Sequence, residues 1–226
     1  GQLNLPESAN GVPDVLDEAA YGLLVWQRSM NSAGGVSGFV ETSTHPLIDS
    51  DIDYAFSRRT RWDSLMFAAA AIQLAEHMKP FDSAGASRWA WYANRAYAFG
   101  MDPKNSLGLT TIRCRSNRGL GDPYTLTWEE KQEYIEPFIL HAKVRMFRYS
   151  GKKDYLTDVP ALIAKVRKPF KWPYSLVDYS PWIFYGIVNK PGIVSEAQRA
   201  ELIKSHFVVN ADSLVAYIEG MPYRCT

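Results

Sequence analysis

Hydrophobic residues return every three or four positions along most of this chain, which is the period of an amphipathic helix. The pattern is clear over residues 14–30, where Val15, Ala19 and Leu23 lead to Trp26. Acidic residues flank Val15 in the first turn, where they favour the positive end of the helix dipole. A helix is therefore predicted over this stretch.

Six further helices are predicted by the same period together with local start and stop signals. Thr127 and Ser195 each stand three positions before a Glu or Gln, which is the capping-box pattern. Pro137 is expected to kink or divide the helix that contains it, because proline lacks the N–H that a helix interior needs. The predicted helices cover residues 62–78, 83–100, 127–151, 158–166, 175–188 and 195–220.

Strand patterns are few, and the best is a short ribbon at residues 34–42. No internal repeat or low-complexity linker divides the chain, so an all-α fold in one piece is predicted, with at most this short ribbon. The stretches 31–60 and 101–126 are expected to be long loops rich in Gly, Ser, Arg and aromatic residues. Long loops on a helical scaffold are where binding and catalytic residues tend to lie.

Net charge, apolar runs and cysteine number give no positive indication of function. The 226 residues carry a net charge of +1, which offers no electrostatic reason to expect nucleic acid or a membrane surface as partner. No apolar run is long enough to span a membrane. Two cysteines, Cys114 and Cys225, form no metal-binding pattern, and either a disulfide or two free thiols fits their number.

Short motifs for metal binding or catalysis are weak. Asp49, Asp51 and Asp53 alternate as in a calcium loop, but Tyr54 stands where that loop needs Gly and Thr60 where it needs Glu. A solvated acidic loop, with Arg residues at 58 and 59 as partners, fits this stretch better. No nucleotide-binding, zinc-protease or serine-hydrolase signature is present.

The chain has seven Trp and thirteen Tyr, more rings than an ordinary core needs. Trp62 and Trp128 lie at predicted helix starts, where a flat indole face can pack against a sugar ring. A half-buried packing role is the alternative for each Trp, because tryptophan is largely buried on average. Among the histidines, His45 in the polar loop "ETSTHP" is the one most suited to a functional role.

Several stretches resemble one enzyme family. "LNLPESANGVPDVLDEAAYGLLVWQRSM" resembles the segment of glycoside hydrolase family 9 that reads roughly "NIPESGNGIPDLLDEARWGLEFLLKMQ". "GGVSGFVETSTHP", "RTRWDSLMFAAAAIQLAEHMKPFD", "WAWYANRAYAFG" and "MFRYSGKKDYL" resemble later elements in the same order. The resemblance covers nearly all of the chain and is most specific over its first hundred residues.

The resemblance implies an (α/α)6 barrel whose active-site cleft is formed by loops at one end. In the family, a catalytic Asp pair precedes the "PES" segment and a catalytic Glu lies far downstream. Residues 1–226 are therefore expected to be the central part of a catalytic domain, without the N-terminal and C-terminal parts of the barrel and with no catalytic residue of their own. We expect this chain alone to be inactive.

For the whole protein, the resemblance implies inverting acid/base hydrolysis of β-1,4-linked glucan or glucosamine-type oligosaccharides, by an enzyme of the endoglucanase or exo-glycosidase type. The substrate-binding residues predicted in this chain are His45, Arg59, Trp62 and Trp128. The expected partners are an oligosaccharide or polysaccharide and the rest of the catalytic domain. The resemblance also implies a secreted or periplasmic protein. The alternative is a non-catalytic, α-helical glycan-binding or interaction protein on the same scaffold.

No cofactor is expected. Members of the family often bind calcium with the help of an Asp-Glu pair at the start of one helix. Pro137 and Phe138 occupy that position here, with Glu136 just upstream. This departure argues against a calcium site in this chain.

Overall fold

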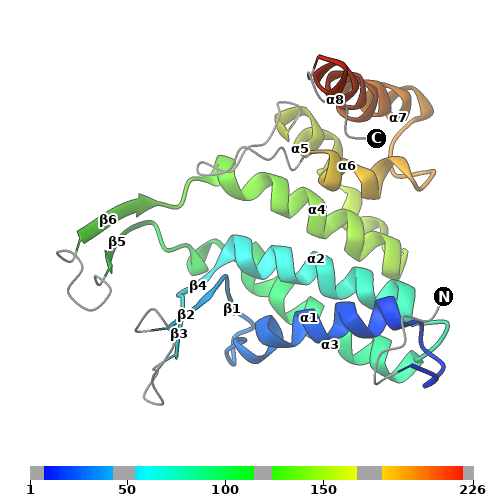
Figure 1. Ribbon diagram of the computed structural model, residues 1–226. Helices are drawn as coiled ribbons and strands as arrows, with labels where there is room; N and C mark the ends of the chain where they lie inside the picture. The colour runs from blue at the N-terminus through cyan, green and yellow to red at the C-terminus, as the bar shows by residue number, and fades with distance from the viewer. Residues whose placement is uncertain (1–7, 43–53, 115–123, 167–179, 221–226) are drawn as a thin grey trace.

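The computed structural model describes residues 8–42, 54–114, 124–166 and 180–220, and its helices carry most of the fold (Figure 1). The helices are α1 (Asp14–Arg28), α2 (Arg61–Met78), α3 (Ser83–Met101), α4 (Gln132–Ser150), α5 (Val159–Val166), α6 (Ser180–Val188), α7 (Glu196–Ile203) and α8 (Val209–Glu219). Short turns complete them: the 3₁₀ turns η1 (Pro103–Asn105) and η2 (Lys153–Leu156), and the π-helical turn η3 (Lys204–Val208), which joins α7 to α8. The predicted all-α class is confirmed.

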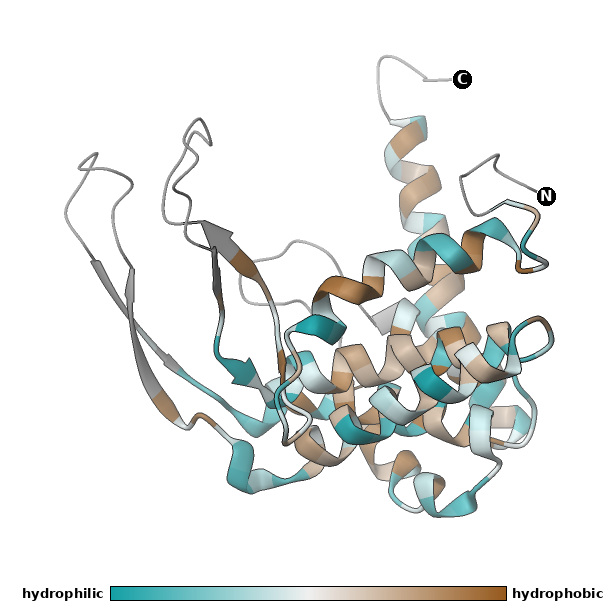
Figure 2. Cartoon of the chain, turned by 90° about the horizontal axis from the view of Figure 1, so that it is seen from below, coloured by the Kyte–Doolittle hydropathy of each residue, from teal (hydrophilic) through white to brown (hydrophobic). Residues whose placement is uncertain are grey.

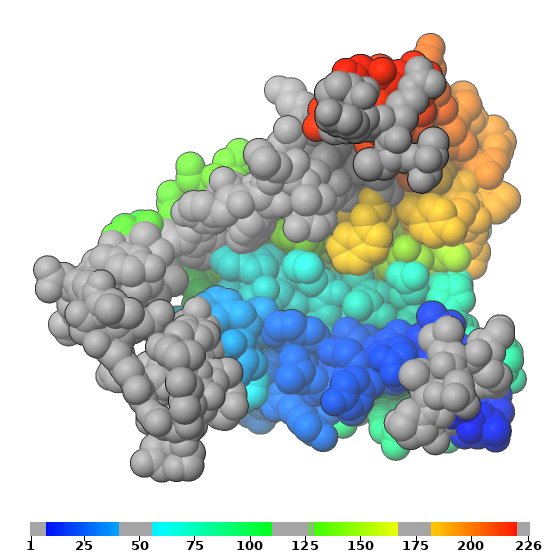
Figure 3. Space-filling view, in the orientation of Figure 1, coloured from blue at the N-terminus to red at the C-terminus, as the bar shows by residue number. Residues whose placement is uncertain are grey.

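Helix α2 is the central element, with α1, α3 and α4 packed around it (Figures 1 and 3). Its middle is rich in alanine, and Ala68, Ala69, Ala71 and Ala75 are fully buried. Alanine combines high helix propensity with a small side chain, so neighbouring helices can approach α2 closely. Helix α2 therefore has little solvent-facing surface for its length.

Two apolar clusters lie against different faces of α2. One joins Leu65 and Ala69 to residues of α4, α5, α6 and α7. The other joins Phe67 and Ile72 to α3 and to the inward face of α1. Seen from below, the hydrophobic residues gather where the helices face one another (Figure 2). The core is thus continuous through α2, and the rest of the chain is layered around that helix.

Local signals explain where several helices begin and end. The Ser195 and Gln198 capping box is present at α7, as predicted. Gly151 follows α4 with a left-handed φ of 71°, a conformation that glycine adopts without steric cost. Pro181 falls in the first turn of α6, where a missing N–H leaves no helical hydrogen bond unmade. Pro181 therefore fits the start of α6.

Pro137 does not divide its helix. Helix α4 runs without a break from Gln132 to Ser150 and includes Pro137 in its second turn, so the proline does not divide it. Pro137 and its neighbours Ile135 and Phe138 are buried. Burial of this apolar stretch against the core offsets the hydrogen bond that the proline cannot make.

Three two-stranded antiparallel ribbons add more strand than the single ribbon predicted. They pair β1 (Val36–Ser37) with β4 (Arg59–Thr60), β2 (Val40–Thr42) with β3 (Tyr54–Phe56), and β5 (Leu109–Cys114) with β6 (Tyr124–Glu129). The first two ribbons include the predicted one at 34–42. The third replaces part of the expected loop at 101–126.

The predicted helix start at Thr127 is wrong. Thr127 lies in β6 opposite Thr111, and α4 begins only at Gln132. β-Branched residues on both strands favour a hairpin here, and cross-strand pairing outweighs the local capping pattern.

Apolar residues remain exposed at the far edge of the helical stack. Helix α8 and the turn before it expose Val208, Val209, Leu214, Val215, Tyr217 and Ile218. No described helix combines the length and the apolar character needed to cross a bilayer.

Gly100 and Gly22 provide a matched test of the close packing around α2. A Cβ atom on Gly100 would lie 2.9 Å from the carbonyl oxygen of Arg61, whereas one on Gly22 would meet nothing within 4 Å. We expect Gly100→Ala to lower the free energy of unfolding by about 1–3 kcal/mol through overpacking. Gly22→Ala should raise it by about 0.5–1 kcal/mol, because alanine loses less entropy in a helix. Urea denaturation measures both, and equal effects would contradict tight packing at Gly100.

Candidate functional site

The ribbons leave the helices at one end of the stack, which we call the ribbon end (Figures 1 and 2). Strand β4 runs directly into α2, and β1 pairs with it so that Val36 lies opposite Thr60. The backbone N–H of Val36 donates to Ser64 Oγ at 3.0 Å, which fastens β1 to the first turn of α2. Strand β6 leads into α4 at the same end. The amino end of α2 is therefore surrounded by chain from three separate segments.

Asp63 is held by a reciprocal cap at the start of α2. The Thr60 hydroxyl accepts a hydrogen bond from the Asp63 backbone N–H at 3.0 Å and donates to the Asp63 carboxylate at 2.5 Å. One threonine thus satisfies a free N–H of the first turn and orients a carboxyl group at the same time. The carboxyl group lies so close to Gly38 that a side chain at position 38 would collide with it.

Burial raises the pKa of Asp63 from 3.8 to about 6. Hydrogen bonds from Thr60 and Trp62 oppose this rise, and the nearby charge of Glu130 adds to it. A carboxyl group with a pKa near 6 exchanges its proton close to neutral pH. It is therefore able to act as a hydrogen-bond donor or acceptor toward a ligand.

A pocket of about 190 Å³ opens beside Asp63. Its walls come from α1, β1, α2 and α6, and its lining includes Trp26, Met66, Phe67 and Trp182. Trp182 is 40% exposed, and its ring meets the ring of buried His141 edge-on at a centroid distance of 4.3 Å. Two indole rings and one carboxyl group around an apolar hollow suit a ligand with both an apolar face and hydroxyl groups.

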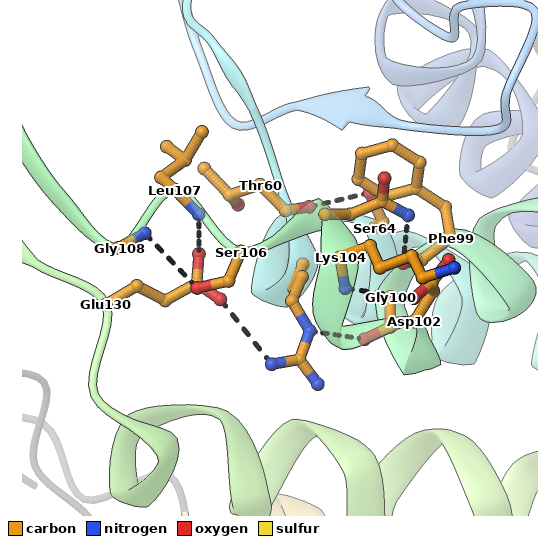
Figure 4. A network of polar contacts seen from close by, with 12 residues as sticks. Thr60, Ser64, Phe99, Gly100, Asp102, Lys104, Ser106, Leu107, Gly108 and Glu130 are labelled. Atoms are coloured by element: carbon orange, nitrogen blue, oxygen red, sulfur yellow. Dashed lines mark hydrogen bonds and ion pairs between the residues drawn. The ribbon is translucent and has the colours of Figure 1, made fainter.

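A second buried carboxylate anchors the β5–β6 ribbon (Figure 4). Glu130 Oε1 lies 3.7 Å from Arg61 Nη1, and Oε2 accepts a hydrogen bond from the Leu107 N–H at 3.2 Å. Arg61 Nε donates to the Gly100 carbonyl at 2.9 Å. The pair therefore joins the start of α2, the end of α3 and both ends of the ribbon. The Arg61–Glu130 pair therefore fixes the base of the β5–β6 ribbon to helices α2 and α3.

Arg59 and Trp62, two predicted binding residues, lie at the ribbon end but are already engaged. The Arg59 guanidinium donates twice to the Ser29 carbonyl oxygen, at 3.1 and 3.3 Å, which ties β4 to the end of α1. Trp62 is half-buried and packs against the apolar cluster shared by α2 and α4. Both residues shape this end of the molecule, and a substrate-binding role for them stays a prediction.

The other two predicted residues are less completely placed. His45 lies outside the described residues. The backbone of Trp128 belongs to β6, opposite Thr110, and so lies on the ribbon that Glu130 anchors. The predicted convergence of His45 with the segment before α2 also stays a prediction.

Sequence reasoning did not single out Asp63 or Glu130. The signal for Asp63 was present, because Thr60 and Asp63 stand three positions apart immediately before an alanine-rich helix. The capping-box pattern at Thr127 predicts a helix-cap role for Glu130, whereas in the structure Glu130 pairs with Arg61. Its burial depends on the ribbon, which the sequence pattern did not predict.

His141 is not a candidate acid or base. It is buried, and burial together with the nearby Arg145 lowers its pKa to about 3, so the ring is neutral. Arg145 Nε donates to His141 Nε2 at 3.3 Å, which leaves the proton on Nδ1. Among the described residues, no group of three His, Cys, Asp or Glu side chains is placed to hold a metal ion. The expected absence of a cofactor stays a prediction.

Comparison with known proteins finds the fold in solved structures only. No family model and no curated protein matches the sequence. A metagenome-derived glycoside hydrolase family 9 endoglucanase matches 98% of this chain at 26% identity, with a TM-score of 0.74. A family 9 protein from Bacteroides ovatus matches 99% at 19% identity, with a TM-score of 0.69. A thermostable endoglucanase from Alicyclobacillus acidocaldarius matches 95% at 23% identity, with a TM-score of 0.68.

The chain spans 39%, 41% and 39% of the length of these three structures. The last two are below 25% identity and speak for the fold alone. The resemblance to glycoside hydrolase family 9 is confirmed, and so is the assignment of the helices to part of an (α/α)6 barrel.

The raised pKa of Asp63 predicts a defined pH dependence of stability. A carboxyl group whose pKa is higher in the folded chain binds its proton more tightly there. Its contribution to stability is therefore complete below about pH 4 and is lost as the pH rises through about 6. We expect Asp63→Asn to flatten the fall in unfolding free energy between pH 4 and pH 7, as measured by urea denaturation. The exposed control Glu201→Gln should leave the profile unchanged, and an unaltered profile in Asp63→Asn would contradict the assignment.

The buried pair predicts a large difference between two glutamate substitutions. Glu130→Gln leaves Arg61 buried without a counter-charge and should lower the free energy of unfolding by about 3–5 kcal/mol. Glu196→Gln breaks a surface pair with Arg199 and should cost about 0.5 kcal/mol or less. The double variant Arg61→Met/Glu130→Gln should lose less than the sum of its two single variants. Additive losses would show that the two side chains do not interact.

Proposed function

We propose that this chain, whose fold is that of glycoside hydrolase family 9, forms part of an enzyme that hydrolyses β-1,4-linked glucan or glucosamine-type oligosaccharides. The observation that carries the proposal is the match of 98% of the chain to a family 9 endoglucanase at 26% identity and a TM-score of 0.74. The order of the matching sequence segments supports it as well.

In this proposal the ribbon end forms one wall of the substrate cleft. Asp63 offers hydroxyl groups of the substrate a hydrogen-bonding partner, and Trp26 and Trp182 offer ring faces beside it. The β5–β6 ribbon, which carries Trp128, lines the cleft further along. His45, Arg59 and Trp62 remain the other proposed substrate-binding positions.

The proposed chemistry is inverting acid/base hydrolysis. One carboxylate activates a water molecule on one face of the sugar, and one carboxylic acid protonates the leaving oxygen from the other face. We place both groups in parts of the protein that this sequence does not include, as the resemblance implies. This chain then contributes binding and positioning, and its own residues carry out no proton transfer to the substrate.

The proposal includes a partner and a location. The apolar residues exposed on α8 suit contact with the remaining part of the same catalytic domain. An enzyme acting on polysaccharide meets its substrate outside the cytoplasm, so we propose a secreted or periplasmic protein.

The function is tested by comparing this chain with a longer protein that contains it. We expect the longer protein to release sugars from cellohexaose or a chitosan hexamer, with inverted anomeric configuration in proton NMR spectra recorded during the reaction. The 226-residue chain alone should show no turnover, because general acid–base help is typically worth about 10²–10⁴-fold. Turnover by the chain alone, abolished by a substitution within it, would overturn the placement of the catalytic groups. Binding without turnover by the longer protein would favour the non-catalytic glycan-binding alternative.

A further inference from the structure

A second hollow lies between α1 and α3. This α1–α3 groove has a volume of about 580 Å³, within the range of ligand-binding sites. Its floor includes Met78, the last residue of α2. With a rise of 1.5 Å per residue, Met78 lies about 26 Å along the helix from Arg61. The groove and the pocket beside Asp63 share no lining residue, although both are bounded by the last turns of α1.

The groove presents aromatic rings to a ligand. Tyr21 projects from α1 and is 72% exposed. Tyr92 on α3 is half-buried, and its ring centroid lies 4.9 Å from that of Trp91 and 6.1 Å from that of Trp89. The groove thus combines one half-buried ring with one accessible ring, each with an apolar face and a hydroxyl tip.

Polar side chains surround these rings. Asn10 Nδ2 donates to Asp17 at 3.1 Å, and Asp82 accepts a hydrogen bond from the Gly85 N–H at 2.8 Å. Both carboxylates are therefore oriented and still have lone pairs to offer. Glu18 and Arg88 also line the groove, and both are exposed.

This set of groups discriminates among ligand classes. Three carboxylates against one guanidinium repel phosphates, which disfavours nucleotides and nucleic acid. The carboxylates are not grouped so as to hold a metal ion, as judged over the described residues. A purely apolar ligand would cover these charged side chains without giving them partners. A sugar ring fits, because its hydroxyl groups donate to carboxylates and accept from arginine while its C–H face covers an aromatic ring.

We propose that the α1–α3 groove is a second carbohydrate-binding site, which holds an oligosaccharide through Tyr21, Tyr92, Arg88 and the groove carboxylates. The choice of oligosaccharide rests on the proposed function, whereas the position of the site rests on the groove itself. Binding here holds a sugar chain on the protein outside the pocket beside Asp63.

The test measures binding of cellohexaose and of a chitosan hexamer to the 226-residue chain by titration calorimetry, with amide NMR shifts to locate the site. We expect at least one of the two sugars to bind and to shift amides of α1 and α3. Tyr21→Ala and Arg88→Ala should each weaken binding about tenfold, the loss expected for removing one such contact. Tyr217→Ala, which removes a similarly exposed tyrosine on α8, should leave the affinity unchanged.

Three results would overturn the proposal: no binding of either sugar, unchanged affinity in both groove variants, or amide shifts confined to the ribbon end. The last result would still favour the proposed function, because it would place the sugar beside Asp63. Conversely, a longer protein without hydrolytic activity would leave the groove measurement unaffected. The two ideas therefore fail independently.

Discussion

The close packing of the alanine-rich middle of α2 is the constraint on which the rest of the structure depends. Its small side chains let α3 and α4 approach on different faces, so that both apolar clusters share one helix. Larger residues would hold these helices apart and separate the clusters, because protein interiors tolerate little unfilled space. Gly100 has no side chain, and a Cβ atom there would collide with Leu65. The close approach of α3 to α2 therefore continues to the end of α3.

Close packing brings polar groups together where α2 begins. The carbonyl of Gly100 reaches Arg61, and Arg61 reaches Glu130 at the base of the β5–β6 ribbon. Asp63 lies two residues after Arg61 in the first turn of α2, and the charge of Glu130 contributes to its raised pKa. A buried ion pair of this kind adds little to the free energy of unfolding, but removing one partner is costly. The pair therefore disfavours other arrangements of the chain in which the two charges are apart.

The α1–α3 groove and the pocket beside Asp63 differ in what surrounds them. The pocket beside Asp63 is formed by four elements at the ribbon end, where the family resemblance leads one to expect a cleft wall. The α1–α3 groove has walls from two helices and a floor at the opposite end of α2. A protein acting on a long polymer benefits from contacts at more than one place, because a second contact raises the effective concentration of substrate near the first.

The sequence by itself determined the helices, because their apolar period and their caps are local properties: the Ser195 box, Gly151 and the apolar stripe of α1 are all readable without a partner. It also carried the family resemblance. The sequence did not predict the β5–β6 ribbon, because a strand is stabilised by the strand beside it. Thr127 alone fits a helix cap equally well. Asp63, Glu130 and the α1–α3 groove were decided only by tertiary structure, because burial, a raised pKa and a shared hollow come from residues far apart in the chain that packing brings into contact.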